Sequence, residues 1–83
     1  MIAQRPIVLC GLGELGILTL ERLLAFGERV VVVDPRPPEA FAMRCQAAGV
    51  RVVVGSGRDP AVLREAGLAE AKATVEGLER QLA

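Results

Sequence analysis

The sequence predicts a single α/β domain over residues 1–83, in which helices cover both faces of a short parallel sheet. Short apolar runs alternate with amphipathic segments, and a glycine or a proline follows most of them. The runs are apolar at consecutive positions, which indicates strands buried on both faces, as in a parallel sheet. A chain of 83 residues has room for one domain, which excludes a complete enzyme with separate cofactor and substrate domains.

The first strand and the first helix are expected over residues 6–10 and 14–26. The strand is a continuous apolar run that Gly11 ends. The apolar positions of the helix recur at steps of three and four residues, at Ile17, Leu20 and Leu24. This spacing predicts an amphipathic helix, and Gly27 provides its C-terminal stop.

The second strand and helix are expected over residues 30–33 and 37–48. Four consecutive valines favour a strand, and proline at position 35 prevents its continuation. Two further prolines can only begin a helix. The face that this helix is expected to bury consists of Phe41, Cys45 and Ala48.

Residues 50–54 repeat the strand pattern and are followed by a third helix. Asp59 and Pro60 begin that helix, because the carboxylate accepts hydrogen bonds from unpaired N–H groups and proline has no N–H to leave unpaired. A weak fourth strand is expected over residues 71–75. A marginal terminal helix over residues 76–83 would need a surface on which to dock.

Charge and composition exclude several classes of protein. Ten basic and ten acidic residues give a formal net charge of zero, and the chain has no Trp or Tyr. Binding to nucleic acid is therefore not expected, since it needs a basic surface and usually aromatic platforms. No apolar run approaches the roughly 20 residues of a membrane span, so we expect a cytoplasmic protein without direct membrane insertion. Cys10 and Cys45 lie in apolar contexts without the spacing of a metal or redox site.

A glycine-rich loop follows the first predicted strand and opens the first helix. It has the spacing G-x-G-x-x-G and consists of Gly11, Leu12, Gly13, Glu14, Leu15 and Gly16. Gly11 permits a tight turn, Gly13 lets a pyrophosphate approach the backbone, and Gly16 lets the helix lie close to the sheet. The phosphate would meet the helix N-terminus. Glu14 suits the first helical turn but would repel a phosphate unless its side chain points to solvent.

Asp34, at the end of the second predicted strand, completes this pattern. A carboxylate at that place accepts hydrogen bonds from the hydroxyls of an adenine-linked ribose. It would repel a 2′-phosphate, so NAD is preferred to NADP, although Arg36 keeps NADP as an alternative. The chain is long enough for the half of a dinucleotide fold that holds an ADP-like moiety.

Three segments resemble the N-terminal lobe of the regulator-of-potassium-conductance family, which comprises cytoplasmic nucleotide-binding domains of potassium channels and potassium-uptake systems. They are residues 8–16, 31–34 and 48–67, and the similarity extends over about residues 6–75. The glycine loop together with the pattern Gly-x-x-x-Asp-Pro-x-Val-Leu-Arg-Glu-Ala-Gly, which begins at Gly55, is more specific than either part.

The resemblance implies a Rossmann-like, three-layer α/β/α fold with strand order 3-2-1-4, truncated relative to a full dinucleotide-binding fold. It also implies a homodimer and a membrane subunit of a potassium channel or transporter as partner, which would bring the domain to the inner face of the membrane. The implied ligand is NAD or NADH, or alternatively ATP, ADP or AMP. The family commonly has Gly-Asp near the adenosine, where this chain has Gly55 and Ser56. The candidate nucleotide-binding residues are thus the six residues of the glycine loop with Asp34, Pro35, Arg36, Gly55 and Ser56.

We therefore expect a non-catalytic, nucleotide-binding regulatory domain. The chain has no His or Tyr, and its one lysine, Lys72, lies far along the chain from the loop, so no nucleophile with an adjacent base is evident. One alternative is the cofactor-binding half-domain of an NAD-dependent oxidoreductase whose catalytic part lies elsewhere. Another is a small scaffold whose main property is self-association, because the edges of a short sheet expose backbone groups.

Overall fold

The computed structural model describes residues 5–71 and 73–76. The strands are β1 (Ile7–Cys10), β2 (Val30–Asp34), β3 (Arg51–Val54) and β4 (Ala73–Glu76). The helices are α1 (Glu14–Ala25), α2 (Glu39–Ala47), α3 (Pro60–Glu65) and the short 3-10 helix η1 (Leu68–Glu70). The terminal helix predicted for residues 76–83 lies outside the described residues except for Glu76, which belongs to β4.

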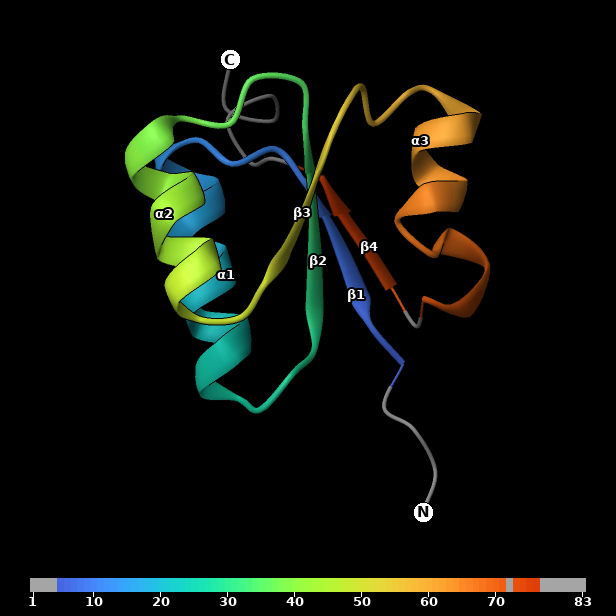
Figure 1. Cartoon of the computed structure of the whole chain (residues 1–83). Coiled ribbons are helices and arrows are strands. Elements are labelled where there is room, and N and C mark those ends of the chain that lie inside the picture. Colours follow the sequence, from blue (N-terminus) through green and yellow to red (C-terminus); the bar gives the residue numbers. More distant parts are fainter. Residues whose placement is uncertain (1–4, 72, 77–83) are drawn as a thin grey trace.

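All four strands form one parallel sheet in the order β3-β2-β1-β4. Val8 of β1 pairs with Val31 of β2 on one side and with Thr74 of β4 on the other, so β1 and β2 are the central strands. Helices α1 and α2 cover one face of the sheet and α3 covers the other (Figure 1). The predicted three-layer arrangement and strand order are therefore confirmed.

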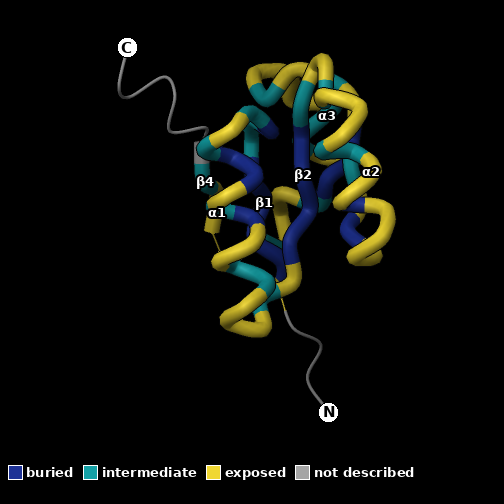
Figure 2. The backbone as a smooth tube through the Cα atoms, turned by 90° about the vertical axis from the view of Figure 1, so that its left-hand side faces the viewer, coloured by how far each residue is buried: buried dark blue, intermediate teal, exposed yellow. Residues whose placement is uncertain are grey.

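The core is divided by the sheet into two apolar clusters. The cluster on the α1 and α2 side consists of Leu9, Leu12, Ile17, Leu20, Val30, Val32, Cys45 and Val50. The cluster on the α3 side consists of Val8, Val31, Val33, Val53 and Ala66. Successive side chains of a strand point to opposite faces, and here both faces are covered, which is why β1 and β2 are apolar at consecutive positions (Figure 2).

Helix α2 ends earlier than its sequence indicates. Gly49 has a φ of +72°, in the left-handed region, and the Val50 N–H donates to the Cys45 carbonyl oxygen at 2.8 Å. These are features of a glycine-terminated helix end. Ala48 therefore lies beyond the helix and is exposed, so its predicted place on the buried face is wrong. Cys45 is fully buried as expected, and Phe41 packs against the same cluster.

The chain between α3 and β4 also differs from the expectation. The fourth strand begins at Ala73 rather than at residue 71, since the short helix η1 extends to Glu70 and Ala71 is its C-cap. Three residues are too few to show a helical period, so η1 could not be predicted from a residue pattern. In the part of the chain that the structure describes, no helix has the length and apolar character needed to cross a membrane.

Candidate functional site

The candidate nucleotide site lies at the carboxyl edge of the sheet, the upper end in Figure 1, where the loops after β1, β2 and β3 meet. Backbone hydrogen bonds continue past the strands and fix where these loops begin. The Gly11 N–H donates to the Val33 carbonyl oxygen at 2.8 Å, and the Gly55 N–H donates to the Asp34 carbonyl oxygen at 3.1 Å. In open parallel α/β sheets this is the edge at which ligands bind.

The glycine loop has the geometry that its spacing predicts. Gly11 turns the chain out of β1 with a φ of +103°, which favours glycine. Gly13 is extended at the N-cap of α1, and the Ile17 N–H donates to its carbonyl oxygen at 2.8 Å. A Cβ atom at Gly16 would collide with the Gly11 carbonyl oxygen, so α1 lies directly against the turn. The steric tasks of Gly11 and Gly16 are therefore seen in the structure, and phosphate contact stays a prediction.

Asp34 joins this loop to the end of β2. Its Oδ2 accepts a hydrogen bond from the Leu12 N–H, and its Oδ1 accepts one from the Arg36 N–H, each at 2.7 Å. The structure thus brings together the two features that the sequence singled out separately. A carboxylate has about four lone-pair sites, so roughly two of those on Asp34 remain for a ligand.

The other predicted residues beside this carboxylate differ in what they offer. The Leu12 side chain is fully buried in the core, so only the backbone of this residue is left to contact a ligand. Leu15 is partly buried, while Glu14, Pro35 and Arg36 are exposed. Because Glu14 is exposed to solvent, the repulsion between its carboxylate and a bound phosphate would be weaker than for a buried side chain. Arg36 contributes a backbone N–H to the Asp34 carboxylate, and its guanidinium is at the surface.

The loop after β3 closes the site on its third side. A Cβ atom at Gly55 would lie 2.6 Å from Cγ2 of Val62, so this glycine lets α3 pack against the strand end. The Ser56 Oγ accepts a hydrogen bond from the Arg58 N–H at 3.1 Å and thereby shapes the turn. Gly57, which the sequence interpretation did not select, lies against β1, because a Cβ atom there would lie 3.1 Å from the Cys10 Sγ. The close Gly-Ser-Gly spacing was the available signal for it.

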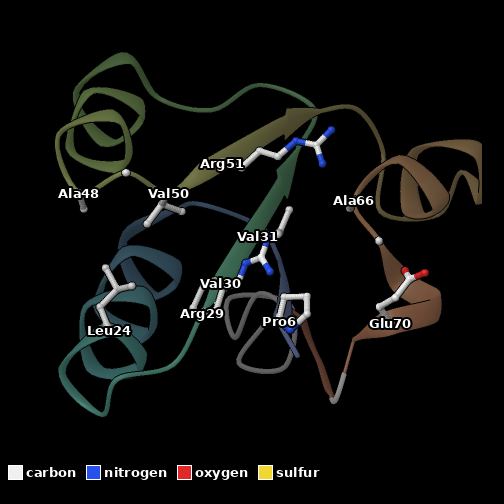
Figure 3. A pocket seen from close by; sticks show the side chains of 12 residues that line it. Pro6, Leu24, Arg29, Val30, Val31, Ala48, Val50, Arg51, Ala66 and Glu70 are labelled. Atoms are coloured by element: carbon white, nitrogen blue, oxygen red, sulfur yellow. The ribbon is translucent and has the colours of Figure 1, made fainter. Parts of the chain in front are cut away.

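A cleft of about 480 Å³ lies at the opposite, amino edge of the sheet (Figure 3). It is lined by Pro6, Leu24, Arg29, Val30, Val31, Ala48, Gly49, Val50, Arg51, Ala66, Gly67 and Glu70. Arg51 already has a structural partner, because its Nη1 donates to the Glu65 carbonyl oxygen at 3.0 Å, at the C-terminus of α3. A cation at a helix C-terminus stabilises that helix. None of the candidate nucleotide-binding residues lines this cleft.

The parallel sheet, the glycine loop and the acid at the end of β2 together define a Rossmann-like α/β domain. The comparison with protein families agrees: the sequence profile of the TrkA-N domain matches residues 7–80, and the chain belongs to this family. The resemblance to the N-terminal lobe of the regulator-of-potassium-conductance family is thereby confirmed.

Among solved structures, the chain is similar to the crystal structure of the TrkA-N domain of the inner membrane protein ybaL from Escherichia coli. The TM-score is 0.76 and the sequence identity is 26%, over 92% of this chain and 55% of that one. The chain therefore spans about half the length of that structure. No curated protein matches the chain.

Proposed function

We propose that the chain is a non-catalytic regulatory domain of a potassium transport system, and that it binds the ADP moiety of NAD or NADH, or AMP, ADP or ATP, at the carboxyl edge. The observation that carries the proposal is the contact between the Asp34 carboxylate and the glycine loop. This contact supports the proposal because Asp34, the acid expected to bind ribose, lies beside the loop that leads into α1, whose N-terminus would meet the phosphates. The TrkA-N family membership supports NAD(H) as the ligand.

The phosphates would lie over the N-terminus of α1. Gly13 is the N-cap and has no side chain that would cover this end. The helix dipole favours negative charge there. The ribose hydroxyls would donate to Asp34, and its negative charge disfavours a 2′-phosphate, which selects NAD over NADP.

The adenine ring would lie toward the loop after β3, beside Gly55 and Ser56. The Ser56 oxygen accepts from the Arg58 N–H, and its O–H can still donate to a ring nitrogen. A hydroxyl has no negative charge, so this contact differs from the acidic one that the family commonly has. We expect it to position the ring without adding electrostatic attraction for an amino group.

Calorimetric titration with NAD, NADH, ATP, ADP and AMP tests the proposal, since a chain without Trp or Tyr gives no useful intrinsic fluorescence. We expect heat of binding with adenine nucleotides, and weaker binding of NADP than of NAD. The variant Asp59→Asn should bind the nucleotides as the wild type does. Asp59 caps α3 by accepting a hydrogen bond from the Ala61 N–H at 2.9 Å, and it is not among the candidate site residues. Absence of heat with all five nucleotides would refute the proposal.

The proposed assembly is a homodimer that acts on a membrane subunit of the transport system, at the inner face of the membrane. Strands β3 and β4 are the edges of the sheet, and edge strands expose backbone groups that can pair with another chain. Sedimentation at several concentrations tests the dimer, and a monomer at every concentration would contradict it. Co-purification with a potassium transporter subunit tests the partner.

A further inference from the structure

We propose that Asp34 is also a positioning residue: it holds the glycine loop in its binding conformation before a nucleotide is present. The effect of Asp34 on nucleotide affinity rests on the proposed function. Its effect on the conformation of the loop is independent of any ligand. The carboxylate would thus organise the phosphate site as well as contact the ribose.

The first support is the place of Leu12 in the loop. Leu12 lies between Gly11 and Gly13, two residues whose backbones have wide conformational freedom. Its side chain is fully buried, and its N–H donates to the Asp34 Oδ2 at 2.7 Å. A short hydrogen bond to a charged acceptor is stronger than a neutral one. This bond therefore holds the backbone of Leu12, the residue between the two glycines.

The second support is that one carboxylate holds two segments. Its other oxygen accepts from the Arg36 N–H at 2.7 Å, in the turn between β2 and α2. An ionised carboxylate accepts on both oxygens, whereas an asparagine side chain has one acceptor and one donor group. Asparagine at position 34 can therefore keep at most one of the two hydrogen bonds, and alanine keeps neither.

The consequence is a loop that is ordered in advance. A ligand that binds an already ordered loop loses less free energy to ordering it. Removal of the Asp34 carboxylate should therefore weaken the binding even of a nucleotide that has no ribose hydroxyls. Simple electrostatics predicts the reverse, because loss of a negative charge near a phosphate favours the anion.

Amide hydrogen exchange in the nucleotide-free protein tests the loop directly. In Asp34→Ala, we expect the Leu12 and Arg36 amides to exchange about tenfold faster or more, relative to the slowest strand amides that report global unfolding. In Asp34→Asn, at least one of the two amides should also exchange faster than in the wild type. The control Asp59→Asn should leave both unchanged. Wild-type protection of Leu12 in a folded Asp34→Ala protein would overturn the proposal.

Affinities for AMP and for 2′,3′-dideoxy-AMP give the second readout. If Asp34 positions the loop, Asp34→Ala weakens the binding of both ligands. The affinity for the dideoxy compound should fall by about tenfold. Unchanged or tighter binding of the dideoxy compound, with weaker binding of AMP, would show a ribose contact alone and overturn the positioning role. If neither compound binds the wild-type chain, the proposed nucleotide binding fails, and the exchange experiment still decides the role of Asp34 in the loop.

Discussion

Gly16 of α1 lies so close to Gly11 that a Cβ atom on it would collide with the Gly11 carbonyl oxygen. The obstacle is backbone, which cannot move aside as the end of a flexible side chain can. The start of α1 is therefore in direct backbone contact with the turn after β1, and this packing directs the helix N-terminus toward the carboxyl edge.

The first prediction concerns this contact. Gly16→Ala should lower the free energy of unfolding by about 1–3 kcal/mol, because the added methyl group forces the helix away from the turn. Gly27→Ala is the matched control: its site has open space and a φ of +79°, so its cost is conformational, about 1–2 kcal/mol. Chemical denaturation measures both. Nucleotide affinity should fall only in Gly16→Ala, and an equal affinity in the two variants would contradict this account.

The second prediction concerns the packing of α3 on the third loop. Gly55→Ala should be destabilised by about 1–3 kcal/mol, since the new Cβ lies 2.6 Å from Val62 Cγ2. Val62→Ala removes that atom, so the double variant should be more stable than the sum of the two single effects by about 0.5 kcal/mol or more. A double-mutant cycle by denaturation measures this coupling. Strict additivity would mean that the two side chains do not compete for the same space.

The predictable parts of this molecule are those that a local pattern specifies. Val30–Val33 are apolar throughout because both faces of β2 are covered, and a run of valines shows this directly. The glycine loop is equally local, since its spacing follows from the turn between a strand and a helix. The helical phase of α2 was also apparent at Cys45, but Ala48 shows that phase does not determine where a helix ends.

The parts that could not be predicted depend on how distant segments meet. The Leu12 N–H and the Asp34 carboxylate are 22 residues apart, and their hydrogen bond follows from the parallel register of β1 and β2. The contact between Gly57 and Cys10 likewise requires the third loop to fold over the end of β1. No residue pattern within either segment specifies such a contact.

The third prediction follows from the burial of Cys45. Desolvation raises the pKa of this thiol above its ordinary value, because the thiolate is disfavoured in the apolar core. The folded state therefore keeps the proton at a pH where the unfolded chain loses it. Stability from this group is complete below the unfolded pKa of about 8.5 and is lost as the pH rises above it.

Thermal unfolding of the wild type and of Cys45→Ala, from pH 7 to pH 10, measures this effect. The wild type should lose stability relative to the variant at the alkaline end. Cys10→Ala is the control, because Cys10 is only partly buried. Parallel pH profiles for the wild type and Cys45→Ala would contradict the prediction.

The fourth prediction concerns discrimination between NAD and NADP. Asp34→Ser should shift the ratio of their affinities toward NADP by about tenfold or more, since it removes a charge that repels the 2′-phosphate beside Arg36. The ratio isolates this effect, because any change in the glycine loop weakens both ligands alike. Calorimetric titrations of both dinucleotides measure it. An unchanged ratio would show that Asp34 does not lie beside the ribose of the bound ligand.

The last prediction asks which edge of the sheet binds nucleotides. Arg29→Met and Arg51→Met change the two arginines of the amino-edge cleft and lie outside the carboxyl-edge loops. Arg51→Met should be less stable by about 1 kcal/mol, because the Glu65 carbonyl oxygen loses its donor. Neither variant should change the affinity for AMP or NAD. Weaker nucleotide binding in both variants, with the fold intact, would move the site to the amino edge and leave the glycine loop with a structural task alone.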